Sequence, residues 1–196
     1  IEAIVIQSEV GDMDKAFIES RDMFWLTSID EQGQPTVSYK GGDPGFVKVI
    51  DNKTIAFPLY DGNGMFYSAG NINGNGKVGM LFMDFEKPHR VRVQGVAKLS
   101  ATDPLMKDYV EAQMIARVTV SAIFPNCPRY VHRMQKVKAS HYVPRAQCET
   151  PLAGWKRIDI IQDDLPKQDQ GKAAKAGGVV TIEEWFGKVI AGDPEA

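Results

Sequence analysis

Three short strand-like runs lie close together between residues 34 and 71, and they constrain the fold more than any other feature. The runs are Thr36–Lys40, Phe46–Ile50 and Thr54–Phe57, and Gly, Pro, Asp or Asn residues bound each of them. Short runs with such boundaries are typical of strands joined by turns. The connection Gly41–Gly45 between the first two runs is tight, so we expect those two runs to pair as a hairpin.

The first run alternates strictly between apolar and polar side chains. Val37 and Tyr39 project to one side, and Thr36, Ser38 and Lys40 project to the other. Because side chains alternate along a strand, this pattern suits a sheet with one face in the core and one facing a polar ligand. We therefore expect the apolar side to face the core.

A glycine-rich turn, Asp61-Gly62-Asn63-Gly64, follows the third run and precedes a short helix expected to begin near Met65. Glycines let the backbone turn its N–H groups inward, and the start of a helix adds a positive dipole. Together these features can hold a phosphate group. The alternative, a turn without a ligand, stays open on the residues alone.

The remaining pattern predicts a mainly β (α+β) fold. Helices are expected at Asp12–Ser20 and at 102–116, and strands at Met23–Ile29, Lys77–Phe85, His89–Leu99 and Arg117–Phe124. Gly95 lies inside the expected strand His89–Leu99, where a glycine often marks a bulge. Phe24 and Trp25 are both expected in the barrel core.

Several ordered blocks resemble one family. The blocks PTVSYKGG-PGFVKV, FPLYDGNGMFYSAGNI and VGMLFMDFEKPHRVRVQG are similar to those of FMN-binding split-barrel proteins related to pyridoxamine 5'-phosphate oxidase. The resemblance spans about Phe17 to Arg133. It implies an FMN-binding split β-barrel with flanking helices, FMN as cofactor, and a homodimer whose flavin sites lie at the subunit interface.

The resemblance also implies a set of site residues. Residues 37–39 would face the pyrimidine edge of the ring, residues 57 and 58 would flank the site, and residues 63–65 would donate to the phosphate. The complete cofactor-binding set is Val37, Ser38, Tyr39, Lys40, Phe57, Pro58, Asn63, Gly64, Met65, Arg90, Arg129 and Trp155. No metal ligand and no catalytic side chain is assigned, because a flavin itself carries the redox chemistry.

The chain departs from the true oxidases of this family at two places that bear on substrate. Asn63-Gly64 stands where those enzymes carry an Arg-Lys pair, and Pro35 stands at the first position of their Arg-x-Val-Leu-Leu-Lys strand. Their basic C-terminal ending is also missing. We therefore expect pyridoxamine 5'-phosphate to be a poor substrate.

Two classes of function follow from these observations. The first is a flavin oxidoreductase that transfers electrons to or from an unknown small molecule. The second is a flavin-binding carrier or sensor without turnover. Haem binding, with His89, His132 or His141 as a ligand, and deazaflavin binding are further alternatives for a barrel of this kind.

Composition narrows the partners and the organisation. The chain has 196 residues and a net charge of −2, which offers no general attraction to nucleic acid or to anionic membranes. The chain shows neither a long apolar run nor a basic leader. Its two cysteines form no CxxC pair, and we expect Cys127 to be buried. These features suggest that the protein lies in the reducing cytoplasm. We expect a barrel domain at 1–165, a linker at 166–180 and a C-terminal helix at 181–196, capped by Thr181 and Glu184.

Overall fold

A computed structural model describes residues 2–193, and the chain divides into two compact units at Ala139/Ser140. The boundary differs from the predicted domain limits, because residues 140–165 group with the C-terminal segment and not with the barrel. Ile158 forms a parallel bridge with Val180, and the Asp159 N–H donates to the Val180 carbonyl at 2.9 Å. These bonds span the predicted linker. Each unit is described by itself.

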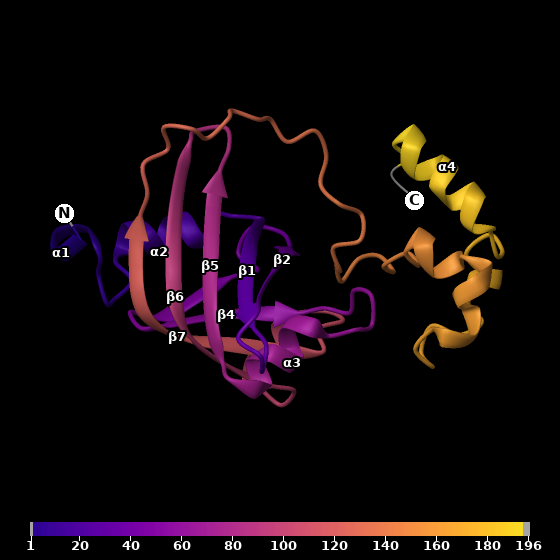
Figure 1. The fold of residues 1–196 in the computed structure, drawn as a ribbon, viewed down its shortest axis with the longest axis horizontal. Helices are drawn as coiled ribbons and strands as arrows, with labels where there is room; N and C mark the ends of the chain where they lie inside the picture. The colour runs from indigo at the N-terminus through magenta and orange to yellow at the C-terminus, as the bar shows by residue number, and fades with distance from the viewer. Residues whose placement is uncertain (1, 194–196) are drawn as a thin grey trace. The chain divides into compact units, whose positions relative to one another are not determined.

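The first unit is a seven-stranded antiparallel sheet in the order β2-β1-β5-β6-β7-β4-β3 (Figure 1). Its sheet does not close on itself, so the predicted α+β split barrel is confirmed. The strands are β1 Met23–Ile29, β2 Pro35–Gly41, β3 Lys48–Asp51, β4 Thr54–Leu59, β5 Lys77–Asp84, β6 His89–Ser100 and β7 Met114–Pro125. The helices are α1 Glu2–Val5, α2 Asp12–Glu19, α3 Tyr67–Gly74 and the 3₁₀ helix η1 Pro104–Asp108.

The predicted hairpin between the first two runs is wrong. These runs became β2 and β3, which are the two opposite edges of the sheet. β2 pairs with β1 through a turn in which the Asp30 carboxylate accepts hydrogen bonds from the backbone N–H groups of Gln32 and Gln34. The Gly45 N–H instead donates to the Glu19 carbonyl at the end of α2. A short, glycine-rich connection therefore carries the chain between two edges.

The helix expected at 102–116 is also wrong. Only η1 forms there, and β7 begins at Met114, directly opposite Leu59 of β4. The Asp103 carboxylate caps η1 by accepting from the Leu105 N–H, and it also pairs with Arg117 of β7 at 2.6 Å. Pairing of β7 with both β4 and β6 thus overrides the local helical spacing.

The bulge expected at Gly95 is confirmed. The register between β6 and β7 shifts between Gln94 and Gly95. A Cβ atom added at Gly95 would lie 2.3 Å from the Thr119 carbonyl oxygen, a distance that no side chain can accept. Glycine is therefore required for β6 to approach β7 at this point.

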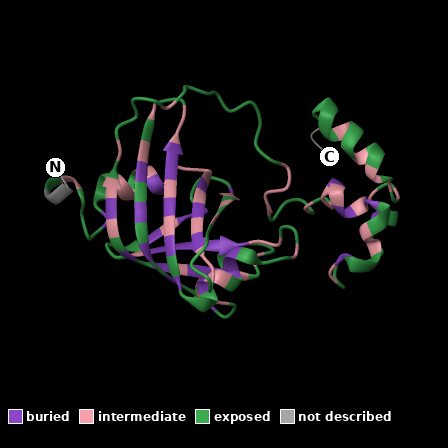
Figure 2. Cartoon of the chain, viewed as in Figure 1, coloured by how far each residue is buried: buried purple, intermediate pink, exposed green. Residues whose placement is uncertain are grey.

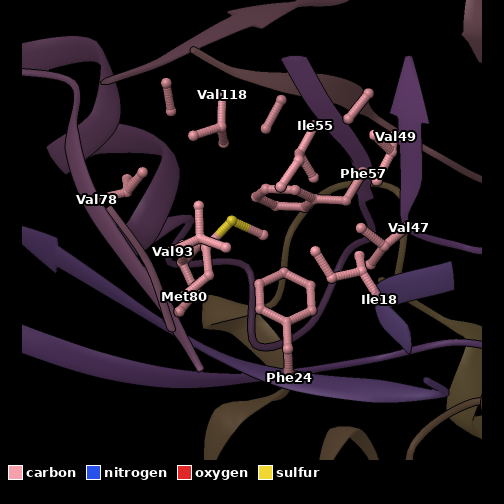
Figure 3. Close-up of a cluster of buried hydrophobic side chains, with 14 of the residues drawn as sticks. Ile18, Phe24, Val47, Val49, Ile55, Phe57, Val78, Met80, Val93 and Val118 are labelled. Carbon is pink, nitrogen blue, oxygen red and sulfur yellow. The ribbon is translucent and has the colours of Figure 1, made fainter. Parts of the chain in front are cut away.

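The core lies on the inner face of the sheet, as the buried positions of Figure 2 show for alternate residues along β1, β5 and β6. The fully buried Phe24 ring packs against three other aromatic rings, with centroids 5.0–5.9 Å apart. Figure 3 shows Phe24 and Phe57 pointing into this common interior with Met80 and Ile18. Aromatic pairs at these distances add to the energy of burial.

The second unit contains three 3₁₀ helices, η2 Gly154–Arg157, η3 Asp159–Asp164 and η4 Lys172–Ala174, and the helix α4 Ile182–Ala191. Lys156 and Asp169 form a buried ion pair at 2.7 Å. The predicted capping box is confirmed, because the Thr181 hydroxyl accepts from the Glu184 N–H and the Glu184 carboxylate accepts from the Thr181 N–H. Within residues 2–193, no helix has the length and hydropathy needed to cross a membrane.

Candidate functional site

The outer face of the barrel carries a row of large side chains that run across neighbouring strands. The pairings Tyr39–Trp25, Trp25–Leu81, Leu81–Arg92 and Arg92–Phe124 place these residues side by side, because cross-strand partners project to the same face. We call them the outer row: Tyr39, Trp25, Leu81, Arg92 and Phe124. None of the five is buried, although four are aromatic or aliphatic.

The orientation expected for β2 is wrong. Val37 and Tyr39 point outward, and each side chain is 63% exposed. Thr36, Ser38 and Lys40 instead share the inner face with residues of β1 that are fully or almost fully buried. The expectation that Trp25 lies in the core fails for the same reason, whereas Phe24 is in the core as expected. The alternation of apolar and polar residues correctly separates the two sides of β2, but the side that faces the core is the polar one.

The polar side of β2 meets helix α3. The hydroxyl groups of Ser38 and Ser68 lie 2.9 Å apart, and Ser38 also donates to the Leu26 carbonyl at 3.4 Å. Lys40 is opposite Phe24, and burial lowers the pKa of its ammonium group. No neighbouring charge among the described residues contributes to that shift. Lys40 is thus a partly desolvated cation that an anionic ligand group would stabilise.

Phe57 and Pro58, which were expected to flank the ligand, lie in β4 and are both buried. The Phe57 side chain is part of the aromatic core and packs edge-to-face against Phe24. Both residues therefore support the barrel wall. Their predicted place beside a flavin stays a prediction.

The glycine-rich turn has the expected position between β4 and α3. Gly64 adopts a left-handed conformation with φ of +76°, as does Phe66 with φ of +48°. The Met65 N–H, however, donates to the Asn63 side-chain oxygen at 3.1 Å. One of the amides predicted to bind a phosphate is thus already engaged within the turn. The turn offers a phosphate less than its glycines suggested.

Arg90 projects from the outer face of β6, two residues before Arg92 of the outer row. Its Nη2 donates to the Cys127 carbonyl at 2.7 Å, which fixes the guanidinium group. Its Nε is buried and has no hydrogen-bond partner among the described residues. A buried donor without an acceptor is costly, so a bound molecule with an acceptor atom would satisfy it.

The remaining predicted residues lie outside this group. Arg129 follows β7 in an exposed segment, where its guanidinium lies 5.8 Å from the Tyr130 ring centroid. Trp155 belongs to the second unit. Cys127, which was expected to be buried, is exposed, and both cysteines are free. The structure thus places Val37, Tyr39 and Arg90 on the outer face, where it adds Trp25, Leu81, Arg92 and Phe124, whereas Ser38 and Lys40 lie on the inner face.

No metal centre forms among residues 2–193, where no cluster of three or more His, Cys, Asp or Glu side chains could hold an ion. Of the three candidate haem ligands, His89 packs edge-to-face against Phe17 with centroids 4.4 Å apart, and His141 contacts the Tyr142 ring. The position of His132 is exposed. These placements do not gather the histidines around one ligand.

The donor set fits a flat, partly apolar ligand with hydrogen-bond acceptors at its edge. The outer row supplies apolar and aromatic surface, and Arg90 supplies a cationic donor on the same face, whereas Lys40 lies on the inner face. An isoalloxazine ring has these properties, because it is aromatic and carries carbonyl oxygens. The glycine-rich turn fits the phosphate of FMN only in part, since Asn63 already occupies the Met65 N–H.

Comparison with known proteins agrees with the fold. Residues 12–145 match the family model described as pyridoxamine 5'-phosphate oxidase. No curated protein matches the chain. The HupZ structure from Group A Streptococcus is 19% identical, with a TM-score of 0.49, and the match covers 64% of this chain and 99% of that one.

Two further solved structures are similar at the same level. A pyridoxamine 5'-phosphate oxidase-like protein from Lactobacillus delbrueckii is 19% identical, with 60% and 95% of the two chains covered and a TM-score of 0.49. HutZ of Vibrio cholerae, described as a haem storage protein, is 17% identical, with 59% and 93% covered and a TM-score of 0.44.

Proposed function

The chain belongs to the pyridoxamine 5'-phosphate oxidase family, and on this premise we propose that it is an FMN-binding oxidoreductase that passes electrons to or from a small molecule. The observation that carries the proposal is the outer row beside Arg90. Apolar side chains that the chain leaves uncovered lie next to a buried guanidinium nitrogen without an acceptor. A flavin ring would cover the first and satisfy the second.

Three residues of the outer face would hold the cofactor through contacts that their positions allow. Tyr39 and Trp25 offer aromatic surface to the ring, and Arg90 offers its Nε to a ring acceptor. Lys40 projects to the opposite, inner face of β2, so its contact with the cofactor stays a prediction from the family resemblance. When bound, FMN supplies the hydride and electron chemistry, while the protein binds, orients and excludes water. No catalytic side chain is proposed.

The proposed assembly is a homodimer. β2 is an edge strand whose exposed Val37 and Tyr39 would leave apolar surface in water, and a second copy would cover it. The family resemblance predicts that each flavin lies between two subunits. Phe57, Pro58, Arg129 and Trp155 stay predictions from that resemblance. The proposed location is the cytoplasm, where the free thiols of Cys127 and Cys148 would stay reduced.

Pyridoxamine 5'-phosphate is not the proposed substrate. Asn63-Gly64 replaces the Arg-Lys pair of the true oxidases, and the Asn63 side chain binds the turn's own Met65 N–H. The turn therefore offers the phosphate of this substrate no positive charge at that position, and one of its backbone N–H groups is already engaged. Oxygen-dependent formation of the aldehyde from this substrate by the purified protein would contradict the proposal.

The visible spectrum of the purified protein, before and after incubation with FMN, tests the proposal. We expect flavin bands, one FMN per chain, and bleaching by NAD(P)H or another donor followed by turnover with an added acceptor. A bound flavin that no donor reduces would support the carrier or sensor instead. A protein that takes up haem but no flavin, or that takes up neither, would exclude both flavin functions.

A further inference from the structure

Residues 126–139, which we call the strap, leave β7 and run past the β5–β6 turn without forming a helix or a strand (Figure 1). The strap begins where the Asn126 N–H donates to the Arg90 carbonyl at 3.2 Å. Its next residue accepts the Arg90 guanidinium hydrogen bond at 2.7 Å. The start of the strap is therefore tied to β6.

Three further contacts hold the strap to the ends of other strands. The Arg133 Nε donates to the Glu86 carbonyl at 3.2 Å, and the Met134 N–H donates to the Phe85 carbonyl at 3.1 Å, both just beyond β5. Lys136 forms an ion pair at 2.5 Å with Asp22, the residue before β1. The strap thus crosses from β7 toward β1 along one end of the outer face.

The far part of the strap lies close to the outer row. The ammonium of Lys136 opposes the rise in the pKa of Tyr39 that burial and Asp22 cause, so it lies within electrostatic reach of that hydroxyl. Met83, an outward-facing residue of β5 beside Arg90, is only 9% exposed, whereas Leu81, two residues along, is less buried. Of these two outward-facing residues of β5, the buried one thus lies at the end that the strap crosses.

The contacts that hold the strap are polar and lie at the surface. Its apolar side chains add little, because Tyr130 and Val137 are 84% and 99% exposed. The Lys136 and Asp22 side chains are themselves 54% and 33% exposed. Exposed ion pairs are weak and screened by salt. A segment held in this way opens at a far smaller free-energy cost than the strands beneath it.

We propose that the strap is a releasable cover over the end of the outer row, and that the Lys136–Asp22 ion pair is its latch. Opening exposes the Met83 end of the outer face while the barrel stays folded. The consequence for a ligand rests on the proposed flavin function: a closed strap slows the departure of FMN from the outer row. The ionisable groups that face the latch are the Asp43 carboxylate and the Tyr39 hydroxyl.

Hydrogen exchange of the full-length protein, measured by mass spectrometry, tests the opening. In Lys136→Gln, we expect peptides that contain the Met134 amide to exchange about two- to fivefold faster, while β5 and β6 stay unchanged. Raising the salt from about 0.05 M to about 0.5 M should accelerate the strap in the wild type and have little effect in the variant. Lys48→Gln, which removes the surface pair with Asp108 at 2.6 Å, is the matched control and should leave strap exchange unchanged.

Equal strap exchange in Lys136→Gln and the wild type would overturn the latch. If the amides of the strap exchange as slowly as those of β5 and β6, the strap does not open separately from the barrel, and the proposal is overturned. FMN release by stopped flow tests the consequence, and we expect it to accelerate by the same factor in Lys136→Gln. Release unchanged despite faster strap exchange would overturn the role as cover. If FMN fails to bind at all, the proposed function fails, and the exchange data alone decide the opening.

Discussion

The inner and outer faces of β1, β5 and β6 use alternate residues of the same strands and differ in what covers them. On the inner face Phe24, Phe82 and Val91 lie next to one another and are fully buried. On the outer face Trp25, Leu81 and Arg92 lie in the same order, and none of them is buried. The chain fills one face itself and leaves the other for a ligand or a second copy.

This difference predicts that substitutions on the inner face act on folding and substitutions on the outer row act on binding. Lys40 is an exception on the inner face, because this cation faces inward opposite the aromatic core residue Phe24. Arg117 of β7 is an exception outside the core, because its partly exposed guanidinium pairs with the buried Asp103 carboxylate. Four substitutions test this difference between the two faces, and they follow in the order of their expected effect on the free energy of unfolding.

The largest effect is expected for Phe24→Ala. The Phe24 ring is fully buried against Phe46, Phe57 and Phe82, so truncation leaves a cavity at the centre of the barrel. We expect a loss of about 3–5 kcal/mol in the free energy of unfolding, measured by urea denaturation. A loss below about 1 kcal/mol would show that the inner face is not the packed core described here.

A smaller loss is expected for Asp103→Asn. Hydrogen bonding to Arg117 lowers the pKa of Asp103 against the opposing effect of burial, and the same carboxylate caps η1. Because Arg117 is 36% exposed, we expect about 1–3 kcal/mol and not the full cost of breaking a buried pair.

The pH dependence of Asp103 follows from the direction of its shift. A carboxyl group with a lowered folded pKa stabilises the protein above its ordinary value of 3.8, and this contribution disappears as the pH falls through the lower folded value. Denaturation at pH 7 and at about pH 3 should therefore separate wild type and Asp103→Asn more at pH 7. An equal difference at both pH values would contradict the ion-paired role.

Lys40→Met is expected to stabilise the barrel by up to about 1 kcal/mol, since it replaces a partly desolvated ammonium with an apolar chain of similar length. The same change should weaken FMN binding if Lys40 faces an anionic group of the cofactor. Thermal unfolding and a flavin fluorescence titration measure the two effects. A destabilised variant would mean that the Lys40 ammonium group stabilises the folded barrel, which contradicts this expectation.

The smallest effect on folding is expected for Tyr39→Ala. Its side chain is 63% exposed on an edge strand, so the free energy of unfolding of the barrel should change by no more than about 0.5 kcal/mol. Sedimentation velocity should nevertheless show a weakened dimer, and FMN affinity should fall. Unchanged association and affinity would remove the outer row from the proposed interface and site.

Local signals in the sequence predicted much of the fold. β1 has the predicted limits, the Gly95 bulge is present, and the Thr181–Glu184 capping box forms. Each of these features depends on a few adjacent residues. The hairpin between β2 and β3 failed because each strand pairs with its other neighbour along the chain, β1 for β2 and β4 for β3. The helix at 102–116 failed because Met114–Ala116 pair with β4, which is distant in the chain, and two of these residues also pair with β6.

The candidate site shows the same limit. The family blocks around Ser38 and Arg90 fall on β2 and β6, but alternation alone could not say which side of β2 faces inward. The sequence pattern predicts that both members of the aromatic pair Phe24 and Trp25 lie in the core, and only Phe24 does. The outer row emerges only from the register of five strands, which no single stretch of sequence contains.

Hydrogen exchange with and without saturating FMN tests the location of the site most directly. We expect FMN to slow exchange in β2 and in the parts of β1 and β6 that contain Trp25 and Arg92. We expect Tyr39→Ala to remove this protection without unfolding the barrel. Protection confined to the second unit, or none anywhere at saturating FMN, would contradict the claim that the outer face of the barrel binds a flavin.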